Sequence, residues 1–117
     1  DLDTAKAMLL TERYLYVGFM CHQVIEKLLK SYYAFIYDDI PRYTHNLKLL
    51  TTKCGLDSIL SEEQKDFINI MMPLNIEARY PTYKEMLLKS ITKTNCIEII
   101  NKTEEFTEWI MKKLMDY

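Results

Sequence analysis

The clearest pattern of apolar and polar positions lies between about residues 16 and 37, and it predicts one long helix. Apolar residues recur there at three- and four-residue steps, which is the spacing of one helix face; they are Val17, Cys21, Val24, Leu28, Tyr32 and Phe35. Ile25, Leu29 and Ile36 widen this apolar stripe to roughly 140° of the circumference at 3.6 residues per turn. A stripe this wide predicts a helix that is buried against more than one neighbour.

The other side of this predicted helix carries chargeable residues. His22, Glu26 and Lys30 follow one another at four-residue steps, and Gln23 and Lys27 flank them. A run of charges on a helix is usually a solvated face, stabilised here by the Glu26–Lys30 spacing. The alternative is a polar groove whose lysines meet phosphate. A metal held by His22 and Glu26 is disfavoured because the sequence offers no third ligand.

Shorter patterns predict further helices before and after the long one. Residues 3–13 form the first, with a break or bend near residues 14–17. Thr44 is predicted to cap a helix over residues 45–53, which would place His45 in its first turn. A capping box from Ser61 to Gln64 opens the next helix, and Pro73 should interrupt it. Its predicted apolar face is Phe67, Ile68, Met71, Leu74 and Ala78.

The C-terminal third contains one ambiguous segment and one clear helix. Residues 83–91 are consistent with a short helix or an ordered loop. The last helix is predicted to begin at Asn95, with Glu98 as its capping partner. Its apolar stripe is Cys96, Ile99, Thr103, Phe106, Ile110 and Leu114.

Together these patterns predict an all-α protein, an up-and-down antiparallel bundle of four to five helices. A length of 117 residues suits one domain, residues 1–117, and 49% apolar residues with only 2 Gly favour helices over a sandwich or barrel. The three cysteines are widely spaced and form no Cys-x-x-Cys pair, so we expect small buried core residues rather than a zinc site.

Charge and missing motifs exclude several classes of function. The net charge of −2 provides no overall attraction for nucleic acid, so any RNA contact must use a local patch. Two glycines cannot build a Gly-rich phosphate loop, and no Gly-x-Ser-x-Gly or His-Glu-x-x-His motif is present. We therefore expect no cofactor, no metal and no enzyme of a known motif class. The three unpaired cysteines fit a reduced, cytoplasmic setting. No apolar run is long enough to span a bilayer and no signal peptide is visible, so we expect no membrane segment.

Two further clusters carry candidate chemistry. His45, predicted at the positive end of a helix, would be a neutral ring that donates, accepts or acts as a base, or else a packed histidine that satisfies backbone groups. Arg79 and Tyr80 precede Pro81 at a predicted helix end. The guanidinium suits phosphate and the phenol ring can stack on a base. The alternative is a structural ion pair with Tyr80 filling a gap between helices.

These clusters, in order, resemble the HEPN family, the domain named for higher eukaryotes and prokaryotes nucleotide-binding. The residues that carry the resemblance are His22-Gln23-x-x-Glu26-Lys27-x-x-Lys30, Thr44-His45-Asn46-Leu47 and Ala78-Arg79-Tyr80-Pro81. It covers nearly the whole chain, and each motif is weak alone. The resemblance implies a four- or five-helix bundle that commonly forms homodimers, in agreement with the pattern of apolar residues.

The resemblance implies more than one activity. Some members of the family are metal-independent endoribonucleases, often toxins of toxin–antitoxin pairs, with an Arg-x4-6-His motif near the dimer axis. This chain has no such motif, because the positions after Arg79 where the histidine would fall are Lys84, Glu85 and Met86. Members with an Arg-Tyr-Pro stretch accompany small nucleotidyltransferase domains as binding partners, and this chain resembles that branch more.

The leading interpretation is therefore a noncatalytic HEPN-like module that dimerises and binds a nucleotide or a phosphorylated ligand beside a nucleotidyltransferase. The predicted ligand-binding residues are Lys27, Lys30, His45, Arg79 and Tyr80. The alternative is a metal-independent endoribonuclease that uses Arg79 and His45 on an RNA substrate. A third interpretation is a pure interaction scaffold, with a dimer face built on aromatic residues expected to be exposed: Tyr14, Tyr16, Tyr33 and Trp109.

Overall fold

The described part of the chain is built of helices. The computed structural model describes residues 2–41, 43–75 and 91–116. In order it contains α1 (Leu2–Leu10), α2 (Tyr14–Tyr37), α3 (Leu47–Lys53), α4 (Glu62–Met71), the 3-10 helix η1 (Met72–Leu74) and α6 (Lys93–Met115). No strand occurs within those residues. The predicted all-α class and helical bundle are confirmed.

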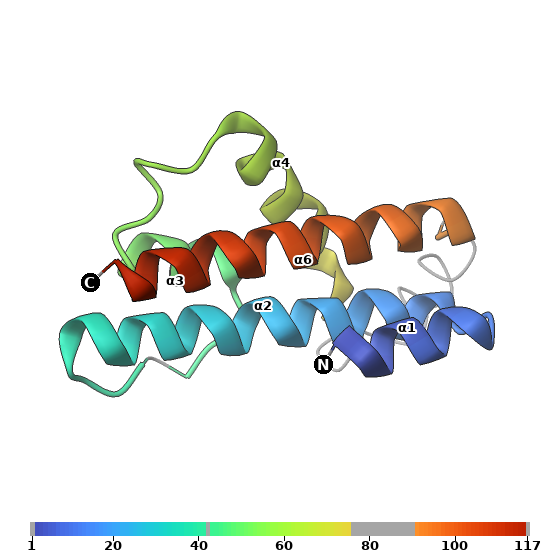
Figure 1. Cartoon of the computed structure of the whole chain (residues 1–117), viewed down its shortest axis with the longest axis horizontal. Helices are drawn as coiled ribbons and strands as arrows, with labels where there is room; N and C mark the ends of the chain where they lie inside the picture. Colours follow the sequence, from blue (N-terminus) through green and yellow to red (C-terminus); the bar gives the residue numbers. More distant parts are fainter. Residues whose placement is uncertain (1, 42, 76–90, 117) are drawn as a thin grey trace.

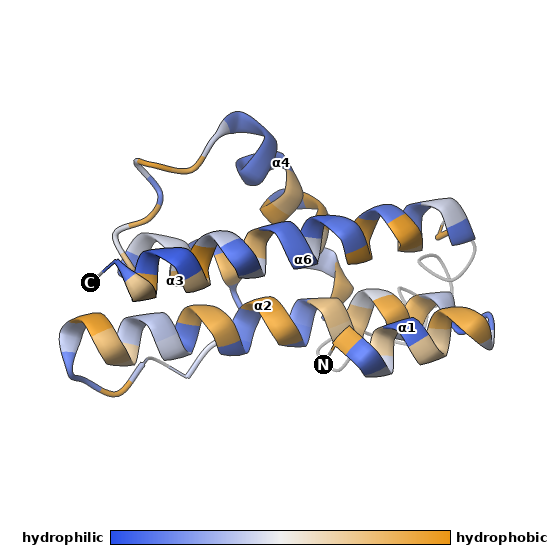
Figure 2. Cartoon of the chain, viewed as in Figure 1, coloured by the Kyte–Doolittle hydropathy of each residue, from blue (hydrophilic) through white to orange (hydrophobic). Residues whose placement is uncertain are grey.

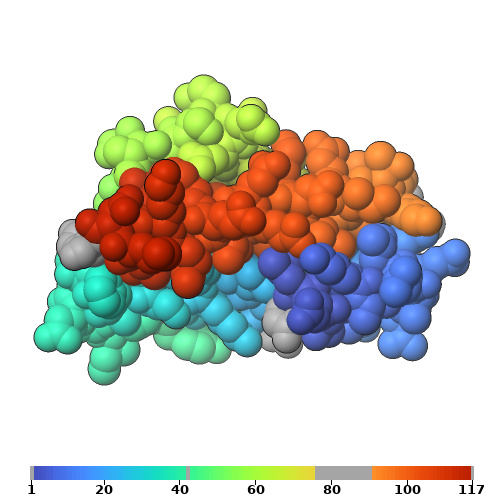
Figure 3. All heavy atoms as spheres, viewed as in Figure 1, coloured from blue at the N-terminus to red at the C-terminus, as the bar shows by residue number. Residues whose placement is uncertain are grey.

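The helix α2 is the centre of the arrangement. It contacts α1, α3, α4, η1 and α6, and α1 also contacts α6. Figure 1 shows α1 folded back along the first half of α2, while α2 and α6 run side by side in the same direction. Figure 2 shows hydrophobic and hydrophilic stretches alternating along these helices. Figure 3 shows the residues of α4 as a ridge along α6.

The buried face of α2 is turned from the one the sequence pattern predicted. Five residues of the predicted stripe are buried, as expected: Val17, Cys21, Ile25, Leu29 and Tyr32. Phe35, however, is 61% exposed. Val24 and Leu28, predicted in the centre of the stripe, are half-buried. The predicted apolar stripe was wide, so the sequence did not fix which of its residues lie at the centre of the buried face. Packing of α2 against α1 and α6 decides this.

All three cysteines are buried and free, as predicted. Cys54 Sγ donates a hydrogen bond to the carbonyl oxygen of Leu29 at 3.3 Å. Burial disfavours the thiolate and raises the pKa of each thiol to about 11. These side chains therefore serve as small, unreactive core residues.

The break between α1 and α2 lies earlier than predicted. Glu12 adopts a positive φ of 61°, and Arg13 N donates to Met8 O at 2.9 Å, which closes α1. The helix α2 then begins at Tyr14, inside the segment where the sequence predicted a bend.

The start of α3 also differs from the prediction. Asn46, and not Thr44, is the N-cap, because its side chain accepts a hydrogen bond from Leu49 N at 3.0 Å. Thr44 Oγ1 instead accepts from Asn46 N at 3.1 Å. His45 therefore precedes the helix and does not lie in its first turn. The prediction that places His45 at the positive end of this helix was wrong.

The predicted capping box at Ser61 is confirmed. Ser61 Oγ accepts from Gln64 N at 3.1 Å, and Gln64 Oε1 accepts from Ser61 N at 2.9 Å. The predicted interruption at Pro73 is confirmed too, since α4 ends at Met71 and a 3-10 turn follows. Of the predicted apolar face, Phe67, Ile68, Met71 and Leu74 are buried. Ala78 and residues 83–90 lie outside the described residues.

The last helix begins two residues before the predicted start. Thr92 is its N-cap and Asn95 is the reciprocal partner of a second capping box. Glu98 is not a capping residue and lies 3.6 Å from Lys102 Nζ. The predicted stripe is otherwise confirmed: Cys96, Ile99, Thr103, Phe106 and Ile110 are buried, and Leu114 is half-buried.

Two expectations about the surface can be compared with the structure. Among the four aromatic residues predicted to be exposed, Tyr16 is 49% exposed. The other three are half-buried: Tyr14, Tyr33 and Trp109. Within the described residues, no helix has the length and apolar character to cross a membrane.

Candidate functional site

A buried carboxylate joins two of the predicted ligand-binding residues. Glu26 is only 4% exposed, on the side of α2 that meets the connection before α3. His45 Nδ1 lies 2.8 Å from Glu26 Oε1, and Lys30 Nζ lies 3.1 Å from Glu26 Oε2. His22 Nδ1, one turn earlier on α2, lies 3.8 Å from Glu26 Oε1. We call Glu26, Lys30 and His45 the Glu26 cluster.

Local sequence rules explain why these groups meet. Lys30 follows Glu26 by four residues, which places both on the same helix face in the favourable order. His45 is brought from 19 residues away, since the cap at Asn46 sets the direction of the chain entering α3. Leu47, next after the cap, is fully buried and anchors that entry. The cluster therefore ties α2 to the start of α3.

The contact with Glu26 determines which nitrogen of His45 faces a ligand. A carboxylate oxygen accepts hydrogen bonds when it is ionised, so the His45 tautomer with its proton on Nδ1 is the one that donates a hydrogen bond to Glu26. The other nitrogen, Nε2, is left to bind a ligand, and it accepts or donates according to the charge of the ring. The side chain of His45 is 35% exposed and that of Lys30 is 23% exposed, so solvent reaches both.

An aromatic ring that sequence reasoning missed completes this surface. Tyr43 is 88% exposed, and its ring centroid lies 5.7 Å from that of His45 in an edge-to-face arrangement. Lys30 Nζ lies 5.7 Å from the centre of the same ring. Tyr43 stands two residues before His45, and that proximity was the available signal. The three side chains offer an ammonium group, an imidazole and an open aromatic face.

The polar side of α2 is thus not the solvated face that was the favoured interpretation. His22 is fully buried and Glu26 nearly so, whereas Lys27 is exposed. Among the described residues, the contacts of the Glu26 carboxylate are with Lys30, His45 and His22. The structure brings Lys30 and His45 together and leaves Lys27 outside their cluster.

Other parts of the predicted site cannot be placed. Arg79 and Tyr80 lie outside the described residues. Within the residues that are described, no group of three His, Cys, Asp or Glu side chains could hold a metal ion.

Comparison with known proteins identifies the family. No curated protein and no solved structure matches this chain. The family model of the HEPN domain matches residues 1–114, almost the full length. The helical bundle agrees with this match, and the motif residues Glu26, Lys30 and His45 meet in space. The chain belongs to the HEPN domain family, whose members are nucleotide-binding or ribonuclease-like modules.

Proposed function

We propose that this chain is a noncatalytic HEPN module that binds a nucleotide or another phosphorylated ligand at the Glu26 cluster. The observation that carries the proposal is the meeting of Lys30 and His45 on one buried carboxylate. The ammonium of Lys30 provides positive charge for a phosphate, and His45 Nε2 provides a hydrogen bond. Lys27, Arg79 and Tyr80 remain part of the proposed site as further phosphate and base contacts.

The geometry also supports a role for Glu26 that the sequence interpretation lacked. The Glu26 carboxylate partly neutralises the positive charge beside it and holds the side chains of Lys30 and His45 in one arrangement. A ligand would therefore meet groups that are already in position to bind it. Tyr43 adds an exposed ring beside them, on which a base can stack. A ligand that has both a phosphate and a flat ring therefore fits these three side chains.

Thermal unfolding with and without ligand tests the proposal. The ligands are AMP, GMP, CMP, UMP and, as a probe without a base, ribose 5-phosphate. A ligand at about 100 times its Kd stabilises the native state by about 2.7 kcal/mol, which raises the Tm by roughly 10 °C for a domain of this size. We expect a shift with at least one nucleotide, and its loss in Lys30→Met and His45→Ala, each compared with its own ligand-free Tm.

A lysine elsewhere on the bundle provides the matched control. Lys93 is exposed at the first position of α6, far along the molecule from α3 in Figure 1. Lys93→Met removes the same charge and should keep the full shift. If Lys30→Met and Lys93→Met respond to the nucleotide equally, the Glu26 cluster is not the binding site.

A second candidate function, metal-independent RNA cleavage, is favoured by one feature of the same site. A carboxylate that holds the Nδ1–H of a histidine leaves Nε2 positioned as a general base. The missing Arg-x4-6-His motif argues against it. Cleavage of single-stranded RNA in EDTA that is lost in His45→Ala and in Glu26→Gln would replace the binding function with this one.

We further propose that the module forms a homodimer and works beside a nucleotidyltransferase. Large apolar side chains are exposed near the C-terminal ends of α2 and α6, which lie at the same end of the molecule in Figure 1. They are Phe35, Tyr37, Met111 and Met115. Sedimentation equilibrium of wild type and Phe35→Glu tests the dimer, because a charge in an apolar interface should produce monomers. Co-purification of a nucleotidyltransferase with the tagged chain tests the partner.

A further inference from the structure

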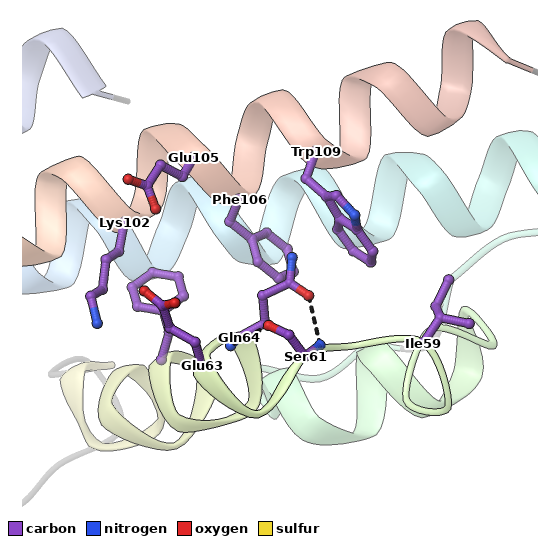
Figure 4. Close-up of a pocket in the computed structure, with 9 residues that line it drawn as sticks. Ile59, Ser61, Glu63, Gln64, Lys102, Glu105, Phe106 and Trp109 are labelled. Atoms are coloured by element: carbon purple, nitrogen blue, oxygen red, sulfur yellow. Dashed lines mark hydrogen bonds between the residues drawn. The ribbon is translucent and has the colours of Figure 1, made fainter.

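A concave site lies away from the Glu26 cluster, between the start of α4 and the middle of α6. Its cavity measures about 440 Å³, within the range of binding pockets. The helix α6 contributes residues from Lys102 to Trp109, and Ile59 lies at the other side. Figure 4 shows Phe106 and Trp109 pointing from α6 toward the α4 side. None of the residues of the Glu26 cluster lines it.

The floor of this groove consists of the buried rings of Phe67 and Phe106 and the half-buried ring of Trp109, and its walls are held in place. The ring centroids of Phe67 and Phe106 are 6.1 Å apart, and those of Phe106 and Trp109 are 5.7 Å apart. The capping box between Ser61 and Gln64 secures the turn that forms the other wall, as the dashed bond in Figure 4 shows. An apolar floor with fixed walls is a surface that a ligand can bind without first reorganising the protein.

The rim of the groove favours a positively charged occupant. Glu63 on α4 and Glu105 on α6 both line it and are exposed, one on each side of the groove. The one cation among the lining residues is Lys102, whose Nζ lies 3.6 Å from Glu98. Lys113 Nζ lies 4.8 Å from the Trp109 ring centroid, so this ring already attracts an ammonium group. Among the described residues that line the groove, the two carboxylates of Glu63 and Glu105 therefore stand against the ammonium group of Lys102, which Glu98 partly neutralises from outside the groove.

The shape of the groove suggests a peptide rather than a single ion. The seven residue steps from Lys102 to Trp109 extend about 10 Å along α6, the length of about three residues of extended chain. Ile59 is 51% exposed at the edge and offers an apolar contact beside the charged rim. A nucleic acid would place phosphates against Glu63 and Glu105, which opposes binding.

We infer that this groove binds a basic segment of a partner protein. An arginine or lysine side chain of the partner lies against the half-buried Trp109 ring between Glu63 and Glu105, and a neighbouring apolar residue contacts Ile59. The inference does not depend on the nucleotide site, since the two surfaces share no lining residue.

Trp109 allows a direct test because it is the only tryptophan of the chain. Its fluorescence is followed while a capped tetrapeptide of alternating leucine and arginine is added. We expect a saturable change with a Kd below about 1 mM. The same peptide with citrulline in place of arginine keeps the shape and loses the charge, so it should bind roughly fivefold more weakly or worse.

Variants of the charged residues at the rim of the groove test whether negative charge there strengthens the binding of the arginine peptide. Glu63→Gln/Glu105→Gln should weaken the arginine peptide roughly fivefold, and Lys102→Gln should strengthen its binding. The matched control is Glu62→Gln, which removes an exposed carboxylate from the same turn of α4 outside the groove. An unchanged thermal midpoint shows that each variant is folded. The inference is overturned if no saturable change occurs below about 1 mM, if citrulline binds equally well, or if Glu63→Gln/Glu105→Gln and Glu62→Gln bind alike.

Discussion

Glu26 is the residue whose replacement tests the structure of the candidate site most directly. Glu26→Ala removes a carboxylate that is 4% exposed and contacts Lys30 and His45 at 3.1 and 2.8 Å. Hydrogen bonds to charged groups contribute about 1.5–3 kcal/mol each. Both partners are partly exposed, so water replaces some of that loss. We therefore expect the free energy of unfolding to fall by about 2–4 kcal/mol.

The size of this loss makes it measurable by ordinary unfolding experiments. The entropy of unfolding for 117 residues is about 0.25 kcal/mol/K, so each kcal/mol lowers the Tm by about 4 °C. Glu26→Ala should thus unfold about 8–16 °C below wild type. Glu26→Gln keeps the shape and one acceptor oxygen, so its loss should be smaller, about 1–2 kcal/mol in urea unfolding.

A neighbouring lysine and a double-mutant cycle separate the cluster from general effects on α2. Lys27→Ala changes an exposed residue next to Glu26 and should stay within about 0.5 kcal/mol of wild type. The cycle of Glu26→Gln with His45→Ala should give a coupling energy of about 1 kcal/mol. If Glu26→Ala also stays within about 0.5 kcal/mol of wild type, the cluster does not hold α2 and α3 together and our reasoning is refuted.

Three further predictions concern the fold. Ser61→Ala removes one half of a capping box and should cost about 1 kcal/mol in urea unfolding. Gly55 has a φ of +71°, and an added Cβ would lie 3.2 Å from Tyr37 Oη. Gly55→Ala should therefore cost about 1 kcal/mol or more, and Gly55→Asn less, because asparagine tolerates a positive φ. The pKa of each buried thiol is raised from 9.0 to about 11, so the native protein should react with iodoacetamide only after unfolding up to pH 9. The same shift means that the folded state keeps protons that the unfolded state releases, so the stability from the thiols is complete below pH 9 and is lost as the pH rises toward about 11.

Each of these predictions has a result that would contradict it. Ser58→Ala, at an exposed position outside the capping box, is the control for Ser61→Ala, and equal losses would show that the cap is not responsible. Equal stability of Gly55→Ala and wild type would mean that the backbone there relaxes out of the positive φ region. Rapid native alkylation at pH 8 would show that the thiols reach solvent.

Features governed by neighbouring residues in the chain were predictable. The capping box at Ser61 depends on residues three apart, and the interruption at Pro73 follows from the missing amide proton of proline. The start of α6 was placed two residues late because Asn95 is a good cap by itself, yet here it completes the box begun by Thr92. Thr44 and Asn46 are likewise two possible N-caps before α3. Asn46 is the N-cap in the structure, and the next residue, Leu47, is buried in the core.

The candidate site was predictable only in part. Lys30 and His45 were recognised from the motifs that resemble the HEPN family. The contact of His45 with Glu26, however, joins residues 19 positions apart in the sequence and depends on the fold. Tyr43 was not predicted as a site residue, although it stands two residues before His45. That its ring also lies beside Lys30 depends on the fold.

The sequence by itself determined the helical class, the capping box at Ser61 and the burial of the cysteines, since helical periodicity, hydrogen bonding at helix ends and the small apolar thiol act over a few residues. Only the tertiary structure decided which side of α2 faces its neighbours, and with it whether Glu26 is a surface charge or a buried one. The physical reason is that an enclosed carboxylate requires cationic or hydrogen-bonding partners. Lys30 reaches Glu26 from the same helix by its four-residue spacing, whereas His45 comes from a segment distant in sequence and is brought to Glu26 by packing.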